Sequence, residues 1–130
     1  MTENSSLDLG PTLLAQASLQ AFHRMQGYDA SELLGNPAAK IRDEIFIEED
    51  QLNDILHVGS PLRMRTLITE GGRLTVYQND DGSELFDFKN DPLEMENLTG
   101  PSALRAEMNE RLINALVANA DVSPKLTAFA

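Results

Sequence analysis

Cysteine is absent from this chain of 130 residues, which excludes disulfides, thiolate metal sites and cysteine nucleophiles. Positive charge is also scarce, because 10 Lys and Arg stand against 21 Asp and Glu and the formal net charge is −11. An acidic chain repels a phosphate backbone, so we expect no nucleic acid partner. Neither His23 nor His57 is followed by a histidine or carboxylate at helical spacing, so neither predicts a metal site.

Long apolar runs are missing too. No stretch approaches the length of about 18 residues that a membrane-spanning helix needs, and the first residues lack the basic segment of a signal peptide. We therefore expect no membrane partner, and the localisation stays open. With 42% hydrophobic and 24% charged residues, the composition is that of a globular protein, and the length fits one compact unit.

The chain begins with a helical pattern. A short helix is predicted within residues 8–19, because apolar residues recur on one side of it and Pro11 suits its first turn. Its other side carries almost no charge, so we expect this helix to lie against something larger than itself. A single helical turn is predicted at residues 31–34 and ends at the Gly-Asn-Pro that follows.

The middle of the chain changes to the pattern of β-strands. One strand is predicted from Ile41 into the acidic run Glu48-Glu49-Asp50. A meander follows, with strands at residues 62–69, 73–77 and 84–88. Gly71 and Gly72 lie between the first two of these strands, and we expect them to supply the positive φ angles of a tight turn.

An apolar stripe from Leu104 to Leu116 predicts a last helix that covers one face of the meander. The predicted fold class is therefore α+β: a small three- to four-stranded antiparallel sheet with a packed C-terminal helix, preceded by a short helical segment. Residues 121–130 show little periodicity and are predicted to form a tail.

Three arginines are the candidates for an anion site. Arg63, Arg65 and Arg73 are expected to come together across the predicted hairpin, where they could hold a sulfate or a carboxylate. The alternative is that they pair with the many neighbouring Asp and Glu side chains. No Gly-x-Ser-x-Gly turn and no glycine-rich phosphate loop occurs, so these patterns predict no catalytic set.

Three stretches match the closing pattern of a known family, in the same order. Two are an Arg-Thr strand at residues 65–69 and an Arg-Leu-x-x-Tyr strand at residues 73–77. The third is the run Glu84-Leu85-Phe86-Asp87, followed by Asp91-Pro92, Glu94 and Asn97-Leu98. Upstream, the Asp-Leu-x-Pro-Thr-Leu-Leu helix of the pattern is similar to residues 8–14.

On these motifs the chain resembles the C-terminal part of the sulfatase family, the sulfuric-ester hydrolases of the arylsulfatase type. The resemblance implies that residues 1–39 correspond to the end of a large α/β catalytic domain. Residues 40–120 then correspond to the C-terminal subdomain, and residues 121–130 to the tail. In this subdomain we expect Glu94 and Asn97 to satisfy backbone groups, which is an architectural task.

The family's catalytic parts do not lie in the portion that resembles this chain. Full-length sulfatases use a formylglycine, made from Cys or Ser in a Cys/Ser-x-Pro-x-Arg motif, and a calcium or magnesium ion. Ser60-Pro61-Leu62-Arg63 and Ser123-Pro124 do not fit this motif, because proline directly follows serine. We therefore expect no catalytic residue, metal ligand or cofactor in this chain. Arg63, Arg65 and His57 are the candidates for the rim of a substrate pocket.

The resemblance predicts a C-terminal fragment of an arylsulfatase-like enzyme that begins at an internal Met, is structural in its parent and is inactive alone. Its expected partners are a sulfatase catalytic domain or a second copy, since an orphaned sheet edge or face favours self-association. The alternative is a stand-alone protein-interaction module derived from the same subdomain.

Overall fold

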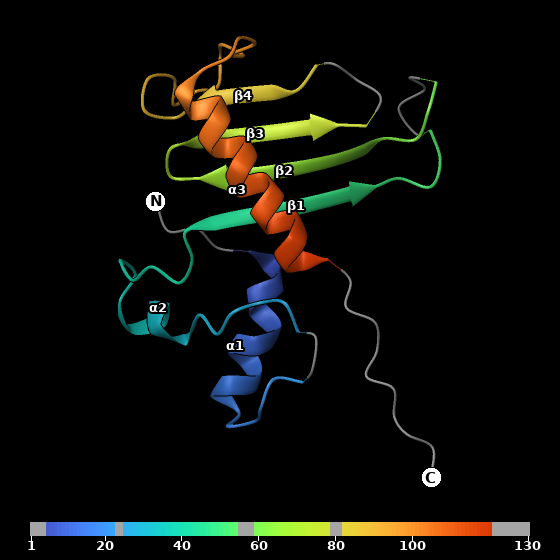
Figure 1. The fold of residues 1–130 in the computed structure, drawn as a ribbon. Coiled ribbons are helices and arrows are strands. Elements are labelled where there is room, and N and C mark those ends of the chain that lie inside the picture. Colours follow the sequence, from blue (N-terminus) through green and yellow to red (C-terminus); the bar gives the residue numbers. More distant parts are fainter. Residues whose placement is uncertain (1–4, 23–24, 55–58, 79–81, 121–130) are drawn as a thin grey trace.

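Four strands form one antiparallel sheet with a long helix on one of its faces (Figure 1). The computed structural model describes residues 5–22, 25–54, 59–78 and 82–120. The strands lie in chain order, and α3 crosses them. The elements are β1 (Glu44–Asp50), β2 (Arg63–Thr69), β3 (Gly72–Tyr77), β4 (Glu84–Asp87) and α3 (Ala103–Asn119). The α+β class, the antiparallel sheet and the packed C-terminal helix are confirmed.

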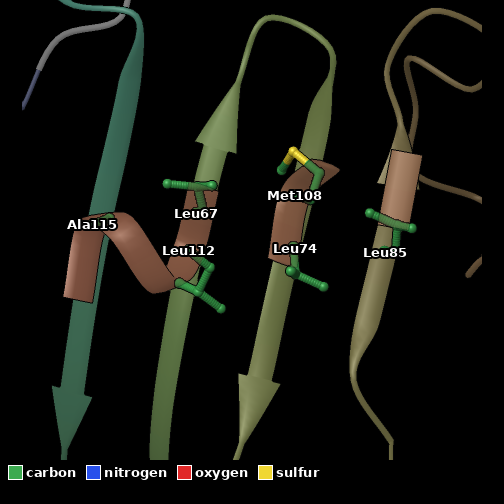
Figure 2. Close-up of a cluster of buried hydrophobic side chains, with 6 residues drawn as sticks. All are labelled: Leu67, Leu74, Leu85, Met108, Leu112 and Ala115. Carbon is green, nitrogen blue, oxygen red and sulfur yellow. The ribbon is translucent and has the colours of Figure 1, made fainter. Parts of the chain in front are cut away.

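The core lies on the face of the sheet that α3 covers. Leu67 is directly opposite Leu74, and Leu74 is directly opposite Leu85, so three leucines form a row across β2, β3 and β4 (Figure 2). This row follows from strand alternation, which sends every second side chain to the same face. The helix covers the row with three buried side chains, Met108, Leu112 and Ala115.

The helix α3 begins after Ser102, whose side chain accepts a hydrogen bond of 3.1 Å from the backbone N–H of Arg105. Its buried positions are spaced by four and then three residues, as an amphipathic helix requires. This spacing corrects the end of the predicted stripe. Ala115 faces the core, whereas Leu116 is exposed.

The structure also corrects four strand boundaries, and the starts of β2 and β3 each differ by one residue from the prediction. β1 begins at Glu44 rather than at Ile41, and its last three residues are the acidic run, all paired with β2. The carboxylates of Glu48 and Asp50 are accommodated there because both form ion pairs with Arg65 on the neighbouring strand. At the other end of the sheet, β4 ends at Asp87, one residue before the predicted end.

The turn between β2 and β3 does not use the glycines as predicted. Neither Gly71 nor Gly72 has a positive φ angle. Instead, Thr69 Oγ1 accepts hydrogen bonds of 3.2 Å from the backbone N–H groups of both glycines. Gly72 is required for space, because a Cβ atom built on it would lie 2.3 Å from the carbonyl oxygen of Phe86 on β4.

A helical lobe, which we define as the described residues between 5 and 39, lies beyond the β1 edge of the sheet (Figure 1). It contains a short 3₁₀ turn, η1 (Ser6–Asp8), followed by α1 (Leu9–Gln16) and α2 (Ser31–Gly35). The helix predicted within residues 8–19 is confirmed as α1. It ends earlier than predicted, because Ser18 takes a positive φ of 58° that breaks the helical path.

Apolar side chains on the lobe face outward. Leu9, Leu13, Leu19 and Leu34 are each more than half exposed. The predicted helical turn at residues 31–34 is confirmed as α2. Among the residues that the structure describes, no helix has both the length and the apolar character to cross a membrane.

Candidate functional site

Two of the predicted rim residues, Arg63 and Arg65, lie at the end of the β1–β2 ladder. The guanidinium of Arg65 donates to both carboxylate oxygens of Asp50, over 2.9 and 3.1 Å, and its Nε lies 2.9 Å from Glu48 Oε1. Hydrogen bonds from Arg65 hold the pKa of Asp50 below its usual value, and the same contact raises the pKa of Arg65. Arg65 is therefore paired with carboxylates in a bidentate geometry, as expected if these arginines pair with neighbouring Asp and Glu side chains.

Arg63 is the more accessible of the two arginines. It is exposed and lies opposite Asp50 in the register, and it lines a shallow groove of about 250 Å³ together with Arg65, Met64 and Gln78. His57, the third predicted rim residue, lies outside the described residues, as does His23.

Arg73 is on the opposite face of the sheet, so the predicted cluster of three arginines is wrong for this residue. Arg65 is paired with Val76 on the face that α3 covers, and alternation along β3 turns Arg73 the other way. There its Nε donates to Glu94 Oε2 over 2.8 Å, and its guanidinium also contacts Glu84 and lies 4.8 Å from the centre of the Phe86 ring. This corrects the expectation for Glu94, which binds an arginine side chain.

The turn that follows β4 is held by side-chain hydrogen bonds to backbone groups. Asp87 Oδ1 accepts from the N–H of Lys89 over 2.9 Å, and Asp91 Oδ2 accepts from the N–H of Glu96 over 2.8 Å. Asn97 Oδ1 accepts from the N–H of Leu85 over 2.9 Å, which confirms the expectation for Asn97. The residues that carry the sequence resemblance therefore close the edge of the sheet.

These hydrogen bonds also set the acidity of the two aspartates in this turn. The pKa of Asp87 is lowered, first by the side-chain hydrogen bond from Asn90, and the pKa of Asp91 is lowered, first by the N–H of Glu96. Both carboxylates are thus stabilised in the charged form that accepts hydrogen bonds, which suits a structural role.

The described residues form no site for the metal ion of a full-length sulfatase. Within the described ranges, no three His, Cys, Asp or Glu side chains come together in a way that could hold a metal ion. Ser60 is followed by Pro61 and is exposed, so it does not provide the formylglycine motif. We derive no catalytic step from these residues.

Sequence reasoning missed one buried ion pair. Asp8 in η1 binds Arg42, and only 4% and 11% of their side chains are exposed. A signal was present, because Ser5 and Asp8 have the spacing of a capping box, and the structure contains this box. The pairing with Arg42, which is far along the chain, had no such signal.

Comparison with known proteins agrees with the fold and with the closing pattern. The family model described as "N-sulphoglucosamine sulphohydrolase, C-terminal" matches residues 2–122. Among the curated proteins, no match was found.

Three solved structures are similar to the chain. Two are described as sulfatases, and one is described as a complex with a sulfated sugar as its substrate. BT4656 in complex with its substrate D-glucosamine-2-N,6-O-disulfate has 25% identity, a TM-score of 0.71 and 92% coverage of this chain. BT1596, described as a 2-O GAG sulfatase, has 24% identity, a TM-score of 0.71 and 85% coverage. A sulfatase structure from Bacteroides thetaiotaomicron has 23% identity, a TM-score of 0.67 and 85% coverage.

The chain spans about a quarter of the length of these structures, namely 25%, 24% and 24%. The family model covers almost the whole chain, and the antiparallel sheet, the packed helix and the turn after β4 agree with it. This chain therefore belongs to the sulfatase family, as a C-terminal sulfatase domain.

Proposed function

We propose that this chain supports the catalytic domain of a sulfatase and hydrolyses no sulfate ester by itself. The observation that carries the proposal is the use of the matching residues: Asp87, Asp91 and Asn97 bind backbone groups of their own turn and of β4. Their side chains are occupied in holding the fold. A sulfatase mechanism in this chain would need a formylglycine and a metal ion; the sequence lacks the formylglycine motif, and the described residues form no metal site.

The proposed partner is a sulfatase catalytic domain. The matched structures are about four times as long as the chain, which leaves room for such a domain in an intact enzyme. The helical lobe supports this partner, because its leucines are exposed and would gain from burial against a larger apolar surface. We place the boundary between the part that belongs to the catalytic domain, residues 1–39, and the subdomain, residues 40–120, within the segment that leads into β1.

The purified 130-residue chain is expected to release no sulfate from an aryl sulfate or from D-glucosamine-2-N,6-O-disulfate, with or without added calcium or magnesium. The reason is chemical: the chain has no cysteine and lacks the motif that yields a formylglycine. BT4656, whose structure holds the disulfated sugar as substrate, is the positive control. Turnover that co-purifies with the chain and is absent from a mock preparation would contradict the proposal.

We also propose that Arg63, Arg65 and His57 border the substrate pocket of the intact enzyme. Of these, Arg63 is exposed and can meet an anion at the surface, while Arg65 shapes the site through Asp50. In an NMR titration of the chain with a sulfate ester, the side-chain Nε–H resonance of Arg63 is expected to shift, whereas that of Arg65 stays in place. Arg63→Ala is the matched variant that removes the response. Shifts at Arg65 alone, or at neither arginine up to saturation, would count against this assignment.

The second candidate function is a stand-alone protein-interaction module. It is favoured by the core, since Leu67, Leu74 and Leu85 are fully buried by α3 without any other domain. Inspection of the neighbouring DNA separates the two functions: a formylglycine motif and metal-binding aspartates encoded upstream favour the sulfatase, and unrelated neighbours favour the module. Self-association through uncovered apolar surface is a property of either, and light scattering measures it.

A further inference from the structure

We propose that the buried Asp8–Arg42 ion pair is the positioning contact that fixes the helical lobe at one orientation to the sheet. The inference goes beyond the proposed function, because it concerns the isolated chain. It also bears on that function, since the orientation of the lobe decides how its leucines and the sheet would face a catalytic domain.

Asp8 forms hydrogen bonds with separate segments of the lobe. One carboxylate oxygen, Oδ2, accepts a hydrogen bond of 2.8 Å from the N–H of Ser5. The other, Oδ1, accepts a hydrogen bond of 2.8 Å from the N–H of Tyr28. The backbone carbonyl of Asp8 accepts from Thr12 Oγ1 over 2.6 Å, and this hydroxyl oxygen accepts in turn from the N–H of Ala30 over 2.9 Å. A single buried residue thus ties the start of α1 to the loop that precedes α2.

Arg42 brings this network to the sheet. It stands just before β1, and its guanidinium binds Asp8 Oδ1 and lies 4.6 Å from the centre of the Tyr28 ring. Its Nε is buried and has no hydrogen-bond partner among the described residues, where the carboxylate and the aromatic ring are the contacts that hold the guanidinium. The same arginine lines a groove of about 580 Å³ with Phe46 of β1 and Ala118 of α3, where lobe, sheet and helix meet.

Several leucines of the lobe contribute little hydrophobic burial to this junction. Four leucines of the lobe are more than half exposed, so most of their apolar surface is not buried against the sheet: Leu7, Leu9, Leu13 and Leu34. A buried ion pair, in contrast, is strongly coupled, because removing one partner leaves the other charge buried and uncompensated. The relative placement of the lobe therefore depends strongly on Asp8 and Arg42.

The test uses two spin labels in the isolated chain. One label is placed at Leu34 in α2 and the other at Ile113 in α3, both exposed, through Leu34→Cys and Ile113→Cys; the absence of native cysteine makes the labelling specific. With Asp8 intact, we expect one narrow distribution of distances between the labels. With Asp8→Asn, which keeps the shape of the side chain and removes its charge, we expect a broad distribution.

Hydrogen exchange shows whether the sheet is still folded. In Asp8→Asn the amides of Tyr28 and Ala30 are expected to exchange at least about tenfold faster, while the amide of Leu74 keeps its protection. The control is Asp29→Asn, because Asp29 is exposed and accepts only from Ser31 in the described hydrogen bonds. This control should leave the distance distribution narrow.

A second variant covers the case in which Asp8→Asn unfolds the whole chain. Arg42→Gln removes the positive charge and the guanidinium above Tyr28, and we expect the distribution to broaden with the sheet intact. A narrow distribution in either folded variant overturns the proposal, as does a loss of sheet protection in both. Because no catalytic domain takes part, hydrolysis by the isolated chain would refute the proposed function and leave this result unchanged.

Discussion

Leu74→Ala is expected to lower the free energy of unfolding by about 3 kcal/mol, the largest effect of any single core truncation in this sheet. Leu74 is 0% exposed and lies on β3, with Leu67 and Leu85 directly opposite on the two neighbouring strands. Removing its branched end leaves a cavity under α3, against Met108 and Leu112 of the same cluster (Figure 2). Urea denaturation followed by circular dichroism measures the change.

This loss is large beside the total stability of about 5–15 kcal/mol that a domain of this size has. The matched control is Leu93→Ala, which removes the same atoms from a side chain that is 78% exposed. We expect this variant to stay within about 0.5 kcal/mol of the parent chain. Equal losses from the two variants would mean that the row of leucines is not the centre of the core.

The sheet and α3 could be predicted because their signals are local. The strands around Leu67 and Leu74 are rich in β-branched and aromatic residues, and the stripe through Met108 and Leu112 repeats at helical spacing. The start of β1 was less visible. Ile41 extends the apolar pattern, but the strand begins at Glu44, where the acidic residues find arginines on other elements, a pairing that the local sequence does not contain.

The arginines show where prediction of the candidate site stops. Their pairing with carboxylates follows from the excess of acidic residues, but the partner of each arginine depends on the register. Arg65 and Arg73 are separated by the parity of the β2–β3 pairing, which puts Arg65 opposite Val76 and turns Arg73 to the other face. The Asp8–Arg42 pair joins residues with no shared motif, and only the folded chain brings them together.

The glycines of the β2–β3 turn carry the second large prediction. Gly72→Ala is expected to lower the free energy of unfolding by about 2–3 kcal/mol, the upper part of the range for an added methyl group in a packed region. The new Cβ would lie 2.3 Å from the carbonyl oxygen of Phe86, which is backbone of β4 and cannot move aside without opening the β3–β4 pair. Urea denaturation gives the loss.

Gly71→Ala separates the two reasons for having glycine in this turn. The nearest atom to a Cβ built on Gly71 is Thr69 Oγ1 at 3.7 Å, an ordinary contact, and the backbone φ of Gly71 is not positive. We therefore expect Gly71→Ala to stay within about 0.5 kcal/mol of the parent chain, or to stabilise it slightly by restricting the unfolded state. If both substitutions were equally costly, the turn would need glycine for its backbone angles. If only Gly72→Ala lowers the free energy of unfolding, the close approach of β3 to β4 is the reason for glycine at position 72.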